Sequence, residues 1–158
     1  MDLNLPKART LKRDASILKR LVAFILDLLI VNIVIVSPFQ KVFYKVIDPS
    51  FSIMETINQM QASITTGVYS ALFFIGILSL AYFTFFQLKI MQTPGMMILK
   101  IRVEGELTFF KALLRNLFIL PFFPFYILWI VEPVHLLIRG RRFLEEITKT
   151  KTVEEIVY

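Results

Sequence analysis

Residues 67–86 read GVYSALFFIGILSLAYFTFF, and none of these twenty residues carries a charge. At a rise of about 1.5 Å per residue, a helix of this length can cross the roughly 30 Å hydrocarbon core of a bilayer. An uninterrupted apolar run of at least about 18 residues is typical of a transmembrane helix. The run therefore predicts a membrane-spanning helix over residues 67–88.

A second apolar run precedes it, from Leu21 to Phe39, and is interrupted mainly by Asp27 and Asn32. It is longer than the core of about 7–15 residues that a secretory signal has, and no small-residue cleavage pattern follows it. We therefore expect a first transmembrane helix over residues 20–39. A carboxylate inside such a helix costs about 2.5–3.5 kcal/mol on insertion scales, so Asp27 is a candidate functional residue.

The last apolar block, Leu113 to Ile138, is broken by Pro121, Pro124 and Pro133. It can form either one kinked span or a re-entrant hairpin that turns between the first two prolines. A single span would place the basic residues after it on the outer side, against the positive-inside bias. A hairpin avoids this, although each arm of about 12–14 residues is too short to cross the bilayer. We favour the hairpin.

These runs divide one membrane domain, residues 1–158, into segments. The two spans and the third block (112–139) alternate with a basic cytoplasmic N-terminus (1–19), an outer loop (40–66), a cytoplasmic loop (89–111) and a tail (140–158). The outer loop holds either a short amphipathic helix at the interface, with apolar residues at helical spacing, or an extension of the next span. Residues 98–109 predict a small β-hairpin, and residues 147–153 have the composition of a strand. The fold class is thus all-α membrane protein with a small cytoplasmic β element.

Composition supports this class. Hydrophobic residues make up 56% of the chain and charged residues 19%, with 18 Lys plus Arg against 12 Asp plus Glu. Cytoplasmic basic loops explain the excess of positive charge, so we do not expect nucleic acid as a partner. The absence of Cys excludes disulfides, thiolate metal sites and cysteine nucleophiles. Nucleotide-binding, zinc-protease and nucleophile-elbow motifs are also absent, and we expect neither an enzyme nor a cofactor.

Asp27 needs a partner if it is ionised in the bilayer. Arg20 lies seven residues earlier on the same face, about 10 Å along the axis, which is too far for a direct contact. Arg115, at the start of the third block, is the better candidate. Asp27 is then either a proton- or cation-binding site or half of a structural ion pair. Asn32 is expected to form a hydrogen bond between helices.

Glu132 and His135 are three residues apart and therefore share one helical face. Glu-x-x-His occurs in carboxylate-bridged metal bundles, but those need a second copy of the motif and further glutamates. We expect a polar pair near the membrane surface and no metal site.

Four motifs in order resemble the RDD family of small membrane proteins. They are KRLVAFILD (19–27), QTPG (92–95) running to IRV (101–103), FKALLRN (110–116), and the basic and acidic stretch RRFLEEITKT (141–150). The resemblance covers roughly residues 17–155. It implies a largely uncharacterised family that is suspected of transport, with cation/proton exchange proposed for some members.

The resemblance also carries site residues onto this chain. Arg20 and Asp27 match the first two name-giving residues of the family, and Glu145 stands where the family has its last Asp. Thr93 and Asn116 lie inside the matching motifs as secondary polar residues. The chain departs from the family at Met96, where Lys is common, and at residues 148–149, where Thr-Lys replaces Ala-Gly.

The favoured function is a transporter or cation/proton exchanger subunit, multi-pass in the cell membrane with its N-terminus in the cytoplasm. Asp27 would take up a proton or monovalent cation, Arg20 and Arg115 would tune it, and Glu145 would lie at the cytoplasmic mouth. Because one chain encloses little volume, we expect a homo-oligomer in the lipid bilayer. The alternative is a non-catalytic assembly or regulatory subunit bound to another membrane protein.

Overall fold

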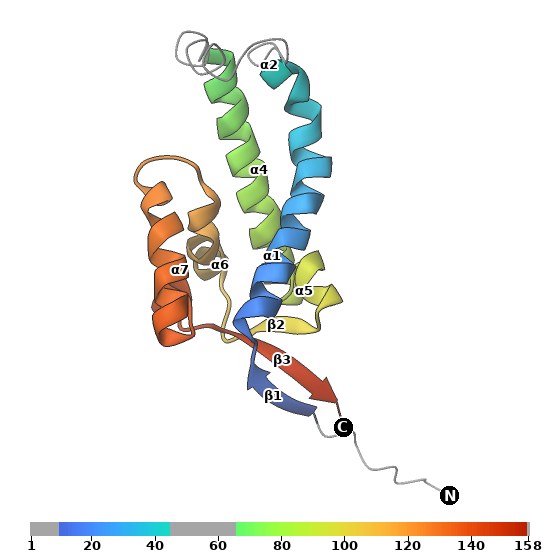
Figure 1. Ribbon diagram of the computed structural model, residues 1–158, viewed down its shortest axis with the longest axis vertical. Helices are drawn as coiled ribbons and strands as arrows, with labels where there is room; N and C mark the ends of the chain where they lie inside the picture. Colours follow the sequence, from blue (N-terminus) through green and yellow to red (C-terminus); the bar gives the residue numbers. More distant parts are fainter. Residues whose placement is uncertain (1–9, 45–65, 158) are drawn as a thin grey trace, which may run out of the picture.

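Two long helices run side by side along most of the molecule in the computed structural model, which describes residues 10–44 and 66–157 (Figure 1). The first comprises α1 (Ile17–Val31), a π-helical stretch η1 (Asn32–Val36), a 3-10 turn η2 (Ser37–Phe39) and α2 (Gln40–Tyr44). The second is α4 (Thr66–Ile90). Both are longer than the predicted spans. The predicted interfacial helix lies in residues 45–65, outside the described part of the chain.

Both helices are long and apolar enough to cross a membrane, over Ile17–Phe43 and Gly67–Ile90. Only 17% of the first apolar window and 39% of the second are buried inside the molecule. The core helix of a soluble protein would be mostly covered by its own chain. So much exposed apolar surface on neighbouring helices indicates contact with lipid or with another protein.

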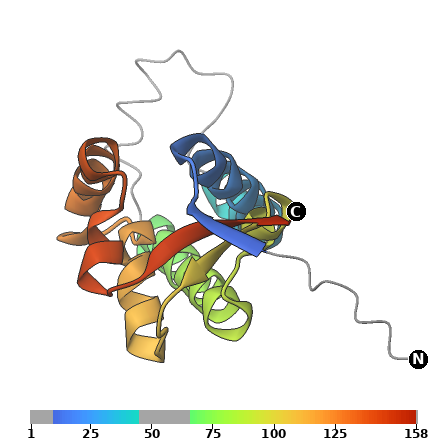
Figure 2. The same ribbon diagram turned by 90° about the horizontal axis from the view of Figure 1, so that it is seen from below.

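A three-stranded antiparallel sheet lies at one end of the long helices. Its strands β1 (Thr10–Asp14), β2 (Ile101–Glu104) and β3 (Lys151–Val157) are arranged in the order β1-β3-β2. Figure 2, seen from this end, shows β3 passing between the other two. The sheet thus brings both ends of the described chain together with the segment that follows α4.

The predicted hairpin over residues 98–109 is wrong, because β2 pairs with the C-terminal strand instead of with residues 107–110. Those residues begin a helix, α6 (Phe109–Asn116), whose N-cap is Thr108. Its hydroxyl accepts a hydrogen bond from the backbone N–H of Lys111, at 3.4 Å, and this local cap competes with strand formation.

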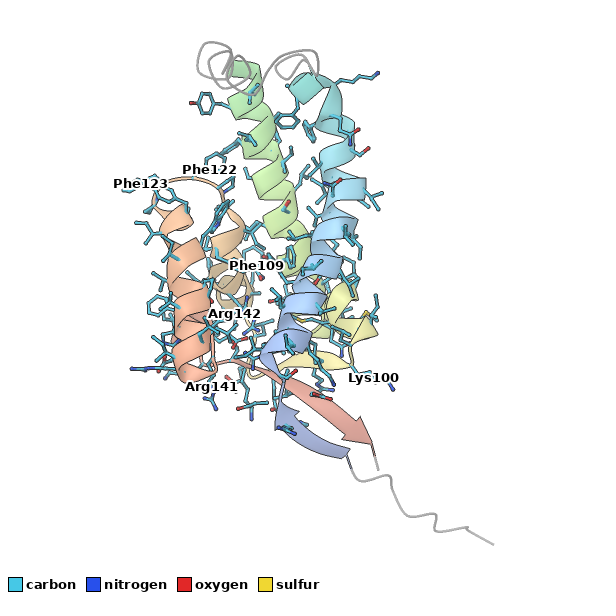
Figure 3. All side chains as sticks on the ribbon, in the orientation of Figure 1. Lys100, Phe109, Phe122, Phe123, Arg141 and Arg142 are labelled. Atoms are coloured by element: carbon cyan, nitrogen blue, oxygen red, sulfur yellow. The ribbon has the colours of Figure 1, made fainter. Side chains whose placement is uncertain are left out.

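The third apolar block folds back on itself as a helical hairpin (Figure 1). It runs through α6, η3 (Leu117–Ile119), η4 (Phe125–Ile127) and α7 (Leu128–Arg139), and α8 (Phe143–Ile147) leads from it to β3. At the turn, the Phe122 ring packs against Phe73 of α4, with 5.8 Å between centroids. Phe123 lies at the outer tip and is exposed (Figure 3). Both ends of the hairpin adjoin the sheet, so the block begins and ends at the same end of the molecule.

Two small apolar clusters hold the long helices. Ala15, Ala23 and Ile101 form one cluster near the sheet, against the short helix α5 (Pro94–Ile98). Val31, Ile35 and Phe83 form the other, between the two long helices. Along the first long helix, the buried polar residues Arg20 and Asp27 lie between the sheet and the second cluster.

Candidate functional site

Glu145 is the centre of a buried ion-pair network, which we name the arginine cluster (Arg20, Arg115, Arg142, Glu145, Thr150 and Thr152). Its carboxylate accepts hydrogen bonds from Arg20 Nη1 at 3.0 Å, Arg115 Nη2 at 2.6 Å and Arg142 Nε at 3.4 Å. These three arginines come from α1, α6 and the turn before α8. The side chains of Arg115 and Glu145 are fully buried. One carboxylate thus ties together three segments that lie far apart in the sequence.

Local structure explains how Glu145 is placed. It is the third residue of α8, and it also accepts a hydrogen bond from the backbone N–H of Arg142, at 3.3 Å. This reach back to the N-cap residue is the carboxylate half of a capping box. Figure 3 shows the consequence for two consecutive arginines: Arg142 lies inward, between α7 and α1, whereas Arg141 lies at the lower end of α7.

Two threonines of the tail complete the arginine cluster. Arg115 donates to Thr150 Oγ1 and Thr152 Oγ1, both at 2.7 Å. Arg20 donates to the backbone carbonyls of Ala15 and Thr152, both at 3.0 Å. The tail composition that predicts a strand also supplies these contacts, because residues two apart on an extended chain share a face.

The charge balance keeps Glu145 ionised. Burial alone would raise the pKa of this carboxyl, but Arg115, Arg142 and Arg20 outweigh burial and hold the pKa of Glu145 well below its usual range. Thr152 adds a hydrogen bond in the same direction, at 2.5 Å. The cluster therefore works as a permanent electrostatic clamp at neutral pH.

Asp27 forms a second, separate site, which we name the Asp27 site (Asp27, Tyr82, Thr93 and Gly95). Its carboxylate is almost completely buried and accepts hydrogen bonds from Tyr82 Oη at 3.1 Å, Gly95 N at 2.8 Å and Thr93 Oγ1. All three donors are neutral. Within residues 10–44 and 66–157, no Lys, Arg or His contacts this carboxylate.

The QTPG motif builds one wall of the Asp27 site. Thr93 caps α5, since its hydroxyl accepts from the backbone N–H of Met96 at 3.3 Å, and Pro94 occupies the first helical position. Gly95 then lies directly against α1. A Cβ atom on it would lie 2.2 Å from the carbonyl oxygen of Ala23 and 2.9 Å from the Asp27 carboxylate. The motif therefore docks α5 onto α1, and only glycine allows this approach.

The expected ion pair between Asp27 and Arg115 is wrong. Arg115 faces the tail and Glu145, and the Asp27 carboxylate is satisfied by the turn between α4 and β2 instead. Arg115 was expected because of its charge alone. The Asp27 carboxylate instead accepts hydrogen bonds from one backbone N–H and two hydroxyl groups. Sequence reasoning missed Tyr82 and Gly95 as contacts of Asp27. The QTPG motif was a usable signal for the second of these.

The two asparagines behave differently. Asn32 is exposed on η1, and its side chain makes no hydrogen bond to any described residue, so the expected hydrogen bond between helices is not formed within the described part of the chain. Asn116 instead forms a buried reciprocal amide pair with Gln87. Gln87 Nε2 donates to Asn116 Oδ1 at 3.2 Å, and Asn116 Nδ2 donates to Gln87 Oε1 at 3.1 Å. The pair joins α6 to α4.

Glu132 and His135 do not form the expected pair. Glu132 is buried and accepts from the backbone N–H of Leu144 at 2.9 Å. His135 Nε2 lies 3.0 Å from Glu146, and its Nδ1 lies 2.8 Å from the carbonyl oxygen of Arg141. Both residues therefore attach α7 to α8. Among the described residues, no three acidic or histidine side chains gather in a way that could hold a metal ion.

A pocket of about 390 Å³ lies on the sheet side of the arginine cluster. Its lining is mostly charged and comes from the end of β2, from α8 and from the start of β3: Glu104, Gly105, Arg141, Glu145, Glu146, Lys149, Thr150 and Lys151. Glu145 thus borders an opening, although its carboxylate is fully engaged by the arginines.

The family assignment follows from the order of these motifs. The RDD family model matches residues 15–144, most of the chain. This chain belongs to the RDD family. The match includes Arg20, Asp27 and Arg115 and ends one residue before Glu145. No curated protein and no solved structure matches the chain. RDD proteins are generally membrane proteins, in agreement with the two apolar helices.

Proposed function

We propose that this RDD protein is a multi-pass protein of the cell membrane and the subunit of a cation/proton exchanger that binds its ion at Asp27. The proposal rests on one observation. The Asp27 carboxylate is buried on a helix able to span the membrane, and the described residues that donate hydrogen bonds to it are all neutral.

The sheet supports a definite topology. β1 precedes the first long helix, β2 follows the second, and β3 follows the hairpin, so the sheet requires all three strands on one side of the bilayer. Two spans and a hairpin that enters and leaves on the same side satisfy this requirement. The basic residues at that end support a cytoplasmic location for it under the positive-inside bias: Lys12, Arg13, Lys100, Lys149 and Lys151.

The chemistry of the Asp27 site suits a small cation or a proton. An ionised carboxylate in hydrocarbon needs compensating positive charge, which no described side chain supplies in contact. The hydroxyls of Tyr82 and Thr93 can turn from donating to accepting, since an O–H group has lone pairs as well as a proton. Together with the carboxylate they would offer oxygen ligands, which hard cations prefer. The same carboxylate could instead bind a proton.

A homo-oligomer is part of the proposal. Two long helices and one short hairpin enclose little volume, and the pocket beside Glu145 is not lined by Asp27. A second copy in the bilayer would add to the volume that the assembly encloses. The arginine cluster would then hold the cytoplasmic end of each subunit rigid while ions pass at Asp27.

The test is ion flux in vesicles that contain the purified protein and a pH-sensitive dye. Asp27→Asn keeps an oxygen that accepts from Gly95 and Tyr82, so the fold should persist while the charge is lost. We expect cation-driven proton flux to fall to the background of empty vesicles. Asp14→Asn, the same change at an exposed carboxylate, is the matched control and should keep the flux. Unchanged flux in the Asp27 variant would exclude this function.

The second candidate is a non-catalytic assembly or regulatory subunit. The exposed apolar faces of the long helices favour it, because they offer a large surface to another membrane protein. Isolation of the protein from native membranes in mild detergent distinguishes the two candidate functions. A stoichiometric foreign partner would support the second candidate, whereas a homo-oligomer with ion flux would support the first.

A further inference from the structure

The helix α1 has two distinct faces. Its buried residues are Arg20, Ala23, Asp27 and Val31, which recur at intervals of three and four and face the rest of the chain. This face carries both polar sites described above. The outward side of the helix is largely exposed, and part of it also follows a regular pattern.

One stripe of the exposed face consists of Leu18, Leu21, Ile25, Leu28 and Asn32, which we name the α1 seam; the neighbouring Val22, Leu29 and Ile33 are exposed as well. The spacing along it is three, four, three and four residues, the a–d repeat of a coiled coil. The four apolar members are 74%, 52%, 48% and 43% exposed in chain order. A stripe of two heptads is therefore about half exposed or more at most of its positions and has surface left for a partner.

Asn32 shows that lipid alone is a poor cover for this seam. It lies twelve residues beyond Arg20, about 18 Å along the helix axis, and so falls within the hydrocarbon layer when the sheet lies at the cytoplasmic surface. Its amide is exposed and has no hydrogen-bond partner among the described residues. Acyl chains cannot supply one, whereas a neighbouring helix can.

We propose that the α1 seam binds the α1 seam of a second copy, as a parallel two-stranded coiled coil around a two-fold axis normal to the membrane. Asn32 occupies an a position, and each side chain then meets its own copy at the same depth. An amide carries both a donor and an acceptor, so two asparagines satisfy each other. A buried asparagine at a single a position also fixes the register and the two-stranded state of a coiled coil.

The proposed interface leaves the interior of each copy unchanged. Arg20 and Asp27 lie on the buried face of α1, outside the seam, and keep all of their contacts. The proposal rests on the membrane placement of α1 and not on ion exchange at Asp27. Dimerisation and ion flux can therefore fail independently.

Single cysteines test the seam, because the chain has no native cysteine. Leu28→Cys places a thiol on the seam. Val34→Cys places one off the seam, about 9 Å further along the helix axis, at a side chain that is 65% exposed. Both full-length variants are reconstituted at low protein density in phosphatidylcholine–phosphatidylglycerol vesicles and oxidised. We expect a disulfide-linked dimer from Leu28→Cys and monomer from Val34→Cys. Equal cross-linking of the two, or none from Leu28→Cys, would overturn the proposal.

The asparagine is tested in the Leu28→Cys background. Asn32→Leu should weaken dimerisation about 3- to 30-fold, the range expected for hydrogen bonds between membrane helices, and Asn32→Gln should restore part of it. Undiminished dimer in Asn32→Leu would overturn the role of the amide. In native membranes, a cross-linked product with the mass of a different protein would overturn the second copy as the occupant. Asp27→Asn should leave cross-linking unchanged.

Discussion

Asp27 and Glu145 are both almost completely buried, yet the chain surrounds them with different partners. Glu145 accepts from three guanidinium groups that come from α1, α6 and the turn before α8. Asp27 accepts from two hydroxyls and one backbone N–H. The charge of Glu145 is thus neutralised within the protein, whereas the charge of Asp27 is only solvated by dipoles.

The difference separates a carboxylate with counter-charges from a carboxylate without one. A carboxylate paired with several cations is protonated only at low pH, so its ion pairs persist at neutral pH. A carboxylate held by neutral dipoles still lacks a counter-charge, which a mobile proton or cation can provide. Arg20, which binds Glu145, and Asp27 both lie on the buried face of α1, so the arginine cluster fixes the helix that carries Asp27.

Removal of a cation from the arginine cluster should have the largest effect. Arg115→Ala leaves Glu145 buried with fewer partners, and breaking a buried ion pair from one side costs about 3–5 kcal/mol of unfolding free energy. The measurement is chemical unfolding in detergent, followed by the fluorescence of Trp129, the single tryptophan of the chain.

The matched control is Arg139→Ala. Arg139 pairs with Glu146 on the surface, and both side chains are more than half exposed. Pairs of this kind contribute about 0–1 kcal/mol. A loss in Arg115→Ala as small as that in Arg139→Ala would mean that Glu145 does not depend on its buried cations.

An intermediate effect is expected at the Asp27 site. Gly95→Ala places a Cβ atom 2.2 Å from the Ala23 carbonyl oxygen, so α5 must move away from α1. Overpacking of this kind costs about 1–3 kcal/mol. The same unfolding experiment measures it.

Gly140→Ala is the comparison for this second change. Gly140 has a φ of +70°, and a Cβ atom added to it would meet no other atom within 4 Å. Alanine there therefore meets only the backbone cost of the left-handed conformation, about 1 kcal/mol. If the two alanine variants lose equal stability, the close approach of α5 to α1 contributes nothing.

The sequence predicts local features of this protein better than its long-range contacts. Residues 67–86 and 21–39 identify their helices because a long apolar run needs no partner to be recognised. The partner of β2 could not be deduced in the same way, since Val103 pairs with Thr152 almost fifty residues later. Arg115 was assigned to Asp27 on charge alone, and charge does not reveal which of two buried carboxylates an arginine faces. Arg20 and Asp27, in contrast, follow from the family motif.

The smallest effect is expected where neither partner is charged. Gln87 and Asn116 exchange two hydrogen bonds between α4 and α6, and both are buried. Asn116 also donates to the carbonyl of Ala112, at 2.9 Å, so a single Asn116→Leu variant would lose more than the pair. A double-mutant cycle with Gln87→Leu removes that extra contribution.

Hydrogen bonds between membrane helices couple by about 0.6 kcal/mol on average and at most about 1.7 kcal/mol. We expect a coupling energy in this range from unfolding of the wild type, the two single variants and the double variant. A coupling as large as the loss in Arg115→Ala would show that neutral partners hold these helices as firmly as cations do. The contrast between Glu145 and Asp27 would then reflect position in the fold and not the charge of the partners.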